Sequence, residues 1–172
     1  MIDDADARAL EAAQRALADV ARRLADAGAR DEAVAEVVTP KPVLGIARAP
    51  RMRPLARAWR LGPILVAADG RVWSTGRSTR VAEVGRPQHL SSSAEQRRAE
   101  RAAAQKGGFA MGETVNHGVS PIAIDASLVG ASGPIRIRDG ATWLHWGSDA
   151  PAPLERALAD LADLLLHPPA GA

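Results

Sequence analysis

The chain has 172 residues, enough for a domain with a substantial core, and it contains no cysteine. Disulfides, thiol catalysis and cysteine-ligated zinc are therefore excluded. The formal net charge of +2 is unevenly distributed, because residues 1–39 and 111–172 are acidic whereas residues 40–110 carry 14 basic residues against 4 acidic ones. We expect either that acidic terminal helices cover the basic middle or that the middle exposes an anion site.

No apolar run approaches the ~20 residues that a membrane-spanning helix needs. The acidic N-terminus also lacks the features of a signal peptide. We therefore expect a soluble, cytoplasmic protein with no membrane partner and a single domain over residues 1–172. Within it we expect a helical N-terminal arm over 1–39, a sheet with one inserted helix over 40–147, and a C-terminal helix over 148–167.

The first predicted element is a helix over residues 4–27, ended by Gly28. Leu10, Leu17 and Leu24 recur every seven residues, which is the spacing of a narrow apolar seam. The seam is expected to pack on the sheet or on its own copy in a homo-oligomer.

A second, short helix is predicted over 32–38. Residues 40–54 hold four prolines and are expected to be irregular, although 43–47 could form an edge strand, where proline is tolerated. Basic residues recur closely here, as Arg48, Arg51, Arg53, Arg57 and Arg60. Such a run is typical of a solvated loop, and it could also follow a phosphate backbone.

The strongest core signal is a predicted hairpin over 64–73. A two-residue type I′ turn at Asp69-Gly70 would join its strands and pair Val66 with Trp73. Both faces of the hairpin are apolar, so we expect a central position in a covered sheet. The side chains expected to be buried are Leu65, Val66, Val72 and Trp73.

A third strand over 78–84 and a polar linker over 85–93 are expected next. A capping box with Ser92 as N-cap then starts a helix that runs to about Lys106 and ends at Gly107. All its apolar positions are alanine, so the helix can bury little area and should lie on the outside. One side of it carries a candidate anion-binding cluster: Arg97, Arg98 and Arg101.

Residues 108–121 are the most loop-like candidate for chemistry. They carry Glu113, Asn116, His117 and Ser120 between glycines, and we take the first three as weak catalytic candidates. In a strand Glu113 and His117 would lie about 13 Å apart, too far to share a proton. A carboxylate that orients His117 as a general base would have to come from elsewhere in the fold.

A second Asp-Gly hairpin is predicted over 135–146, turned at Asp139-Gly140. The expected core face carries Ile135, Ile137, Thr142, Leu144 and Trp146. The opposite face is a candidate site for a planar anion and carries Arg136, Arg138, Trp143 and His145. Alternatively, the acidic C-terminal helix, predicted from near Pro151, covers that face with Asp160 or Asp163. A cation–π contact between Arg136 and Trp143 is expected.

The sequence contains none of several established catalytic and nucleotide-binding motifs that are recognised by their residue spacing. The four histidines lack metal-ligand spacing, and HExxH, a Walker loop, GxGxxG and GxSxG are all missing from the sequence. We therefore expect no cofactor and no metal.

The runs WRLGPILVAADGRVWSTG, GGFAMGETVN and GPIRIRDG together resemble a family of uncharacterised small Ala/Arg-rich proteins from high-GC actinobacteria. The resemblance implies a bacterial source. Such proteins are sometimes labelled glutaminases, but serine glutaminases are longer and use an SxxK nucleophile. This sequence has no SxxK, so the resemblance supplies no catalytic residue.

Together these patterns predict an α+β fold, with a mainly antiparallel sheet of about five strands, two Asp-Gly hairpins, and N-terminal, middle and C-terminal helices. The function expected is a non-enzymatic binding or assembly module with a basic central surface. An amide-type hydrolase using Glu113 and His117 is the alternative. Nucleic-acid or anion binding through the arginine clusters is a second alternative.

Overall fold

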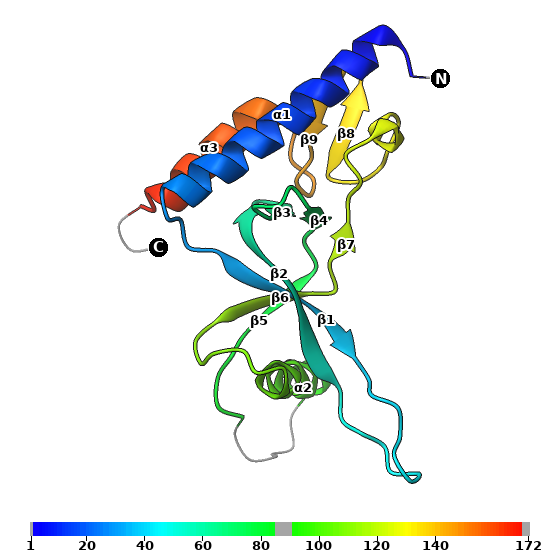
Figure 1. The fold of residues 1–172 in the computed structure, drawn as a ribbon, viewed down its shortest axis with the longest axis vertical. Helices are drawn as coiled ribbons and strands as arrows, with labels where there is room; N and C mark the ends of the chain where they lie inside the picture. Colours follow the sequence, from blue (N-terminus) through cyan, green and yellow to red (C-terminus); the bar gives the residue numbers. More distant parts are fainter. Residues whose placement is uncertain (1, 85–90, 170–172) are drawn as a thin grey trace. The chain divides into compact units, whose positions relative to one another are not determined.

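The computed structural model describes residues 2–84 and 91–169 (Figure 1). Residues 85–90 of the expected linker lie outside this range. The described helices are α1 (Asp4–Asp26), α2 (Ser92–Lys106) and α3 (Leu154–Leu166), with a 3-10 turn at Ala126–Leu128. The described strands are β1 (Glu32–Val38), β2 (Arg51–Leu61), β3 (Ile64–Val66), β4 (Val72–Ser74), β5 (Arg77–Arg80), β6 (Thr114–His117), β7 (Ser120–Pro121), β8 (Ile135–Arg138), β9 (Ala141–Leu144) and β10 (Ala152–Pro153).

The α+β class is confirmed, but the expected number of strands is too low. The strands hydrogen-bond as a seven-stranded sheet in the order β5-β6-β1-β2-β3-β4-β7 and a three-stranded sheet in the order β10-β9-β8. The larger sheet is mixed, because β1 and β6 pair in parallel while the hairpin strands pair antiparallel.

The chain divides into two compact units. The central unit contains Glu32–Arg57 and Thr75–Val119, and the terminal unit contains the residues up to Asp31, Ala58–Ser74 and the residues from Ser120 onward. Strand β2 belongs to both, since it passes from one unit to the other at Arg57. The single domain over 1–172 stays a prediction.

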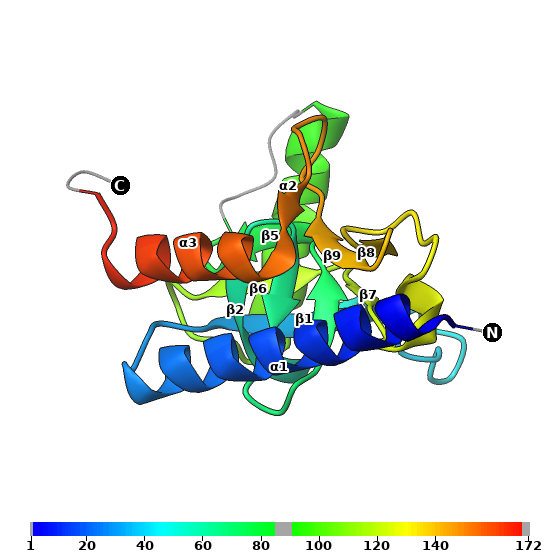
Figure 2. The same cartoon turned by 90° about the horizontal axis from the view of Figure 1, so that it is seen from above.

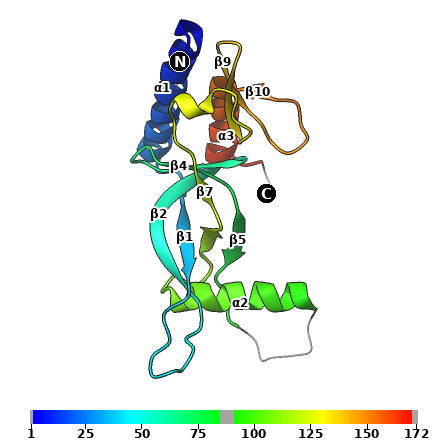
Figure 3. The ribbon, with the colours of Figure 1, turned by 90° about the vertical axis from the view of Figure 1, so that its right-hand side faces the viewer.

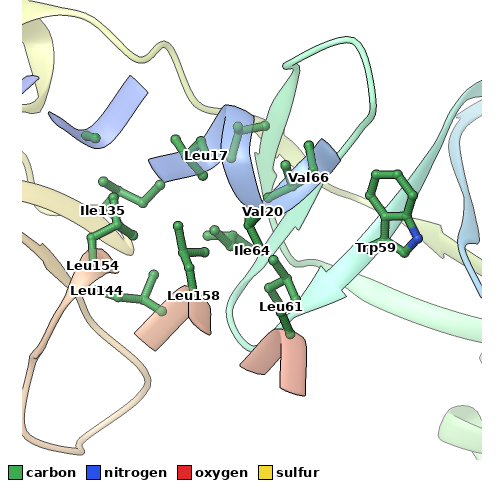
Figure 4. Packing of buried hydrophobic residues seen from close by; sticks show 14 of the residues in the cluster. Leu17, Val20, Trp59, Leu61, Ile64, Val66, Ile135, Leu144, Leu154 and Leu158 are labelled. Carbon is green, nitrogen blue, oxygen red and sulfur yellow. The ribbon is translucent and has the colours of Figure 1, made fainter. Parts of the chain in front are cut away.

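The terminal unit is built on one apolar core. Its helices α1 and α3 lie side by side (Figure 2) and pack on β3, β4, β8 and β9. Figure 4 shows the side chains that meet there, among them Leu17 from α1, Ile64 from β3, Ile135 from β8 and Leu158 from α3. The four hairpin residues predicted to be buried, Leu65, Val66, Val72 and Trp73, are 0–6% exposed.

Helix α1 confirms its predicted extent, and its seam packs within the chain. Asp3 caps the helix by accepting the Asp6 N–H at 2.8 Å. Leu17 and Leu24 are buried in the core of the terminal unit, and Leu10 packs against it. Of the two expectations for this seam, packing within the chain is therefore the one realised, and an oligomer through these leucines is not supported.

The first Asp-Gly hairpin forms with a different register from the one predicted. Val66 pairs with Val72, not with Trp73, so the loop is longer than two residues. The carboxylate of Asp69 accepts the backbone N–H two residues further on, and Gly70 takes the positive φ of 85°. A local side-chain hydrogen bond thus selects a three-residue turn with a glycine bulge in place of the two-residue type I′ turn.

The second Asp-Gly hairpin confirms the predicted type I′ turn. Asp139 and Gly140 both have positive φ, 53° and 68°, and the register pairs Arg136 with Trp143. One core assignment is wrong, because Trp146 lies beyond the paired strand and is 52% exposed.

Residues 32–38 form strand β1, so the predicted short helix is wrong. Ala33 pairs with Val115 and Val34 with Asn116 in the parallel ladder with β6. Non-local pairing and burial of small and β-branched side chains outweigh the local helix preference of this stretch.

The arginine-rich stretch expected to be a loop also contains a long strand, β2. The edge strand expected over 43–47 is instead a tight turn, closed by a bridge between Val43 and Ile46. The third strand, β5, is confirmed but ends at Arg80.

Helix α2 has the predicted end but not the predicted cap. Ser91 is the N-cap and makes no side-chain capping hydrogen bond, whereas Gly107 ends the helix as expected. Its buried residues Ala103 and Ala104 pack on the strands of the central unit. Figure 3 shows the helix next to β5. Helix α3 begins later than predicted, because Ala152–Pro153 first pair with β9 as β10.

Candidate functional site

The central unit holds an open pocket of about 470 Å³ between α2 and its strands. The side chains that α2 contributes to this space include three alanines. Its apolar lining is Val37, Ala49, Pro50, Met52, Ala99, Ala102 and Ala103, and its polar lining is Arg77, Gln96, Glu100, Lys106 and His117. A largely apolar pocket of this size with a few convergent polar groups is typical of small-molecule sites.

Three polar side chains converge at one part of the pocket lining. The antiparallel ladder of β5 and β6 places Arg77 opposite His117, and α2 supplies Glu100. Arg77 donates an ion-pair contact of 3.0 Å to one carboxylate oxygen of Glu100. The other carboxylate oxygen lies 3.8 Å from Nε2 of His117.

His117 is the least satisfied polar group of this cluster. Its side chain is 5% exposed, and Nε2 is buried with no hydrogen-bond partner among the described residues. Burial lowers the pKa of His117, opposed by the negative charge of Glu100 and reinforced by the positive charge of Arg77. The imidazole is therefore neutral at neutral pH. A neutral, buried nitrogen without a partner costs free energy that a bound polar group would recover.

The remaining polar residues of the lining lie along the same helix. Gln96 is one turn before Glu100, and Lys106 lies about 9 Å further along the axis in the other direction, at 1.5 Å per residue. Lys106 forms no ion pair with any residue in the described part of the chain. The pocket thus has hydrogen-bonding groups near His117 and a cation on the far side of the alanines.

The sequence-predicted catalytic candidates are separated by the fold. Glu113 forms a salt bridge with Arg57 and accepts the N–H of Ala110 at 3.0 Å. Asn116 is fully buried and donates to the carboxylate of Glu32 at 2.7 Å. Of the three candidates, His117 alone lines the pocket.

The carboxylate that approaches His117 is Glu100, a residue that sequence reasoning missed. One signal pointed to it: Glu100 is an acid on an alanine-rich helix face, in register with Gln96 and Ala103. That signal identified no partner, because strand and helix come together only in the folded unit.

The arginine clusters lie outside the pocket lining. Arg97 is exposed, while Arg98 and Arg101 are half-buried. On β2, Arg53 pairs with Glu36 and Arg57 with Glu113. Part of the basic surface is therefore matched by acids of the same unit.

In the terminal unit the second predicted anion site takes a different form. Arg136 donates to the carbonyls of Ser132 and Gly133 at 2.8 Å each. Over the described ranges, the cation–π contact that forms is instead Arg71 over Trp73, at 5.3 Å from the ring centroid.

The other members of that predicted site lie on the same hairpin. Trp143 and His145 are half-buried, and Arg138 is exposed. Partial burial and the charges of Arg136 and Arg138 lower the pKa of His145.

The acidic residues of α3 pair with other arginines than those expected. Asp163 pairs with Arg23 of α1, and Asp160 pairs with Arg156 of its own helix. The expected contacts to Arg136 and Arg138 are thus replaced by contacts to other arginines.

Within residues 2–84 and 91–169, no three His, Asp or Glu side chains gather closely enough to hold a metal ion. Over the same residues, no helix combines the length and apolar character needed to cross a membrane. Comparison with protein-family models, curated proteins and solved structures found no match to this chain.

Proposed function

We propose that this protein is a non-enzymatic binding module whose central unit takes a small organic molecule in the α2 pocket. The ligand has an apolar body and a head group with an O–H or N–H donor. The observation that carries the proposal is the buried Nε2 of His117, which finds no hydrogen-bond partner in the described part of the chain and borders a pocket of about 470 Å³.

The spacing of the acceptors defines the head group. Nε2 of His117 and the nearby Glu100 oxygen are 3.8 Å apart, so one oxygen or nitrogen can lie within hydrogen-bond distance of both. A hydroxyl can donate to Glu100 and contact the imidazole, and an N–H₂ group can donate to both. Arg77 balances the charge of Glu100 and keeps this part of the site near neutrality.

The composition of the pocket supports binding over covalent catalysis. Among the described residues that line it there is no serine, threonine or cysteine to act as a nucleophile. The alanines and Met52 provide apolar area, and Lys106 favours an anionic substituent at the far side.

The test compares 2-naphthol with 2-methoxynaphthalene by titration calorimetry. The two molecules have similar shapes, but only the naphthol carries an O–H donor. We expect the naphthol to bind about tenfold more tightly, the worth of one net hydrogen bond of about 1.4 kcal/mol. His117→Leu should reduce that preference, because it removes the imidazole nitrogen that the hydroxyl contacts.

A filled pocket supplies the control. Ala99→Phe places a ring in the pocket and should abolish naphthol binding, while Ser93→Phe adds the same ring at an exposed position of α2 outside the lining. Equal naphthol affinity in both variants would contradict the proposal, as would equal affinity of the native protein for the two probes.

An amide-type hydrolase is the second candidate, favoured by one observation: a carboxylate approaches a neutral buried histidine, as a general base requires. The pair is Glu100 and His117, in place of the Glu113 and His117 of the sequence hypothesis. Release of nitroaniline from acyl p-nitroanilides, abolished by His117→Gln, would replace the binding proposal with this one.

Nucleic-acid binding through Arg97, Arg98, Arg101 and the Arg48–Arg60 stretch is the third candidate. The ion pairs of Arg53 and Arg57 reduce the free positive charge of that stretch. Titration of random duplex and single strands at low salt tests it, because phosphate contacts make affinity fall steeply with salt.

A further inference from the structure

The connection between β1 and β2 ends in an exposed apolar tip, at the lower right of Figure 1. Val43, Leu44 and Ile46 are 54%, 96% and 70% exposed. The backbones of Val43 and Ile46 hydrogen-bond to each other in both directions, at 3.2 and 3.0 Å, so the tip is a closed turn.

Leu44 occupies a backbone conformation that does not suit it. Its φ is 51° and that of Gly45 is 76°, as in the type I′ turns that usually carry Asn-Gly. A leucine with positive φ is strained, and this one has almost no contact with the rest of the chain to offset that strain. Its apolar side chain is therefore unexplained by folding alone.

Unpaired positive charges flank the tip. Lys41 and Arg48 lie two residues outside the Val43–Ile46 bridge on either side, and Arg51 begins β2. All three are exposed and have no ion pair with residues in the described ranges. The sequence has no acidic residue between Glu36 and Asp69.

We infer that this tip binds the surface of an anionic lipid bilayer. The aliphatic side chains enter the headgroup region, and the flanking cations meet lipid phosphates. A narrow, convex tip of aliphatic residues with cations set back by two residues has the arrangement of an interfacial anchor. That no helix of the described residues could cross a membrane does not bear on such contact, since the tip would not cross the bilayer.

The side-chain composition of the tip favours lipid over a protein partner. The tip carries apolar side chains and cations but no aromatic or neutral hydrogen-bonding side chain between Lys41 and Arg48. Protein interfaces rely on aromatic anchors and paired hydrogen bonds, whereas a fluid anionic surface needs only apolar area and positive charge.

The test is co-sedimentation of the full chain with vesicles of phosphatidylcholine alone and of equimolar phosphatidylcholine and phosphatidylglycerol. We expect binding to the anionic vesicles, weakened by salt. Leu44→Asn should raise the half-saturating lipid concentration about tenfold, because it removes an apolar side chain. Asparagine suits positive φ, so the turn itself is preserved. Each of Lys41→Gln and Arg48→Gln should weaken binding about fivefold.

Matched controls are Met111→Ser, which removes an exposed apolar side chain elsewhere in the unit, and Arg80→Gln, which removes an exposed cation on β5. Both should bind like the native chain. The inference is overturned by no binding to anionic vesicles at low salt, or by native-like binding of Leu44→Asn. A self-association of the chain that Leu44→Asn abolishes, without lipid binding, would assign the tip to a second copy instead.

Discussion

Nε2 of His117 and Oε2 of Glu100 lie 3.8 Å apart in the lining of the α2 pocket. This distance is too long for a hydrogen bond between them, but one polar atom of a ligand could lie within hydrogen-bond distance of both. The strand β6 presents the imidazole and the helix α2 presents the carboxylate. Neither side chain alone defines a site, but together with Arg77 they form a polar cluster beside an apolar hollow.

Glu100→Gln should lower the pKa of His117 further. The negative charge of Glu100 raises the pKa of this imidazole, and its removal leaves burial and Arg77, which both lower it. A pH titration of the imidazole resonances by NMR measures the change. Glu95→Gln, on an exposed part of the same helix, is the control and should leave the His117 pKa where it is.

Protonation of His117 should destabilise the protein. Because the folded-state pKa lies below the ordinary value of 6.5, the unfolded chain binds the proton more tightly. The stability that the neutral imidazole contributes is fully present above pH 6.5 and is lost as the pH falls below 6.5. The lowered pKa already includes the opposing effect of the Glu100 charge and the reinforcing effect of the Arg77 charge.

Urea unfolding between about pH 7.5 and 5.5 measures that linkage. The native chain should lose more stability over this range than His117→Gln, which has no group to titrate there. Parallel pH profiles for the two proteins would show that His117 is not held neutral by burial.

Gly76 should not tolerate a side chain. A Cβ at this position would lie 2.2 Å from the carbonyl oxygen of Gly118 and 2.5 Å from its carbon, and both atoms are backbone. Arg77 follows Gly76, His117 precedes Gly118, and both side chains line the pocket. A shift of the backbone here would therefore also disturb the pocket. We expect Gly76→Ala to cost about 1–3 kcal/mol in urea unfolding.

Gly133→Ala is the matched control, since a Cβ there would meet nothing within 4 Å. It should change stability by less than about 0.5 kcal/mol. Equal stability of the two alanine variants would mean that β5 and β6 do not approach as closely as described.

Local sequence signals predicted those features that depend mainly on neighbouring residues, as the two Asp-Gly turns show. Asp139-Gly140 gave the right turn, because both positions need positive φ and the one distant hydrogen bond printed for this turn, from the Gly140 N–H to Asp6, is compatible with it. The same dipeptide at Asp69-Gly70 was misread, since a hydrogen bond from the Arg71 N–H to the Asp69 carboxylate favours another turn. The predicted strand pairing was therefore wrong by one residue.

Non-local pairing explains the larger errors. The stretch Glu32–Val38 has alanines and glutamates that favour a helix, yet it pairs with β6, more than 80 residues further on. The partner of His117 was unpredictable for the same reason. Sequence reasoning required a carboxylate from elsewhere in the fold, and only the packing of α2 identifies it as Glu100.

The seam of α1 should act inside the chain. Leu24 is fully buried in the core of the terminal unit, so Leu24→Ala should cost about 2–5 kcal/mol, and the partly buried Leu10→Ala should cost less. The unfolding midpoint of the native chain should not depend on protein concentration. A midpoint that rises with concentration would indicate an oligomer, since association stabilises the folded state by mass action.

The most direct test of the binding site is the ¹⁵N NMR spectrum of the His117 imidazole with and without 2-naphthol. The account predicts that Nε2 shifts on addition of the naphthol and saturates with the calorimetric affinity, because a ligand group enters its hydrogen-bond range. It also predicts that 2-methoxynaphthalene shifts Nε2 less. An Nε2 resonance that does not move while the naphthol binds would place the ligand elsewhere and contradict the account.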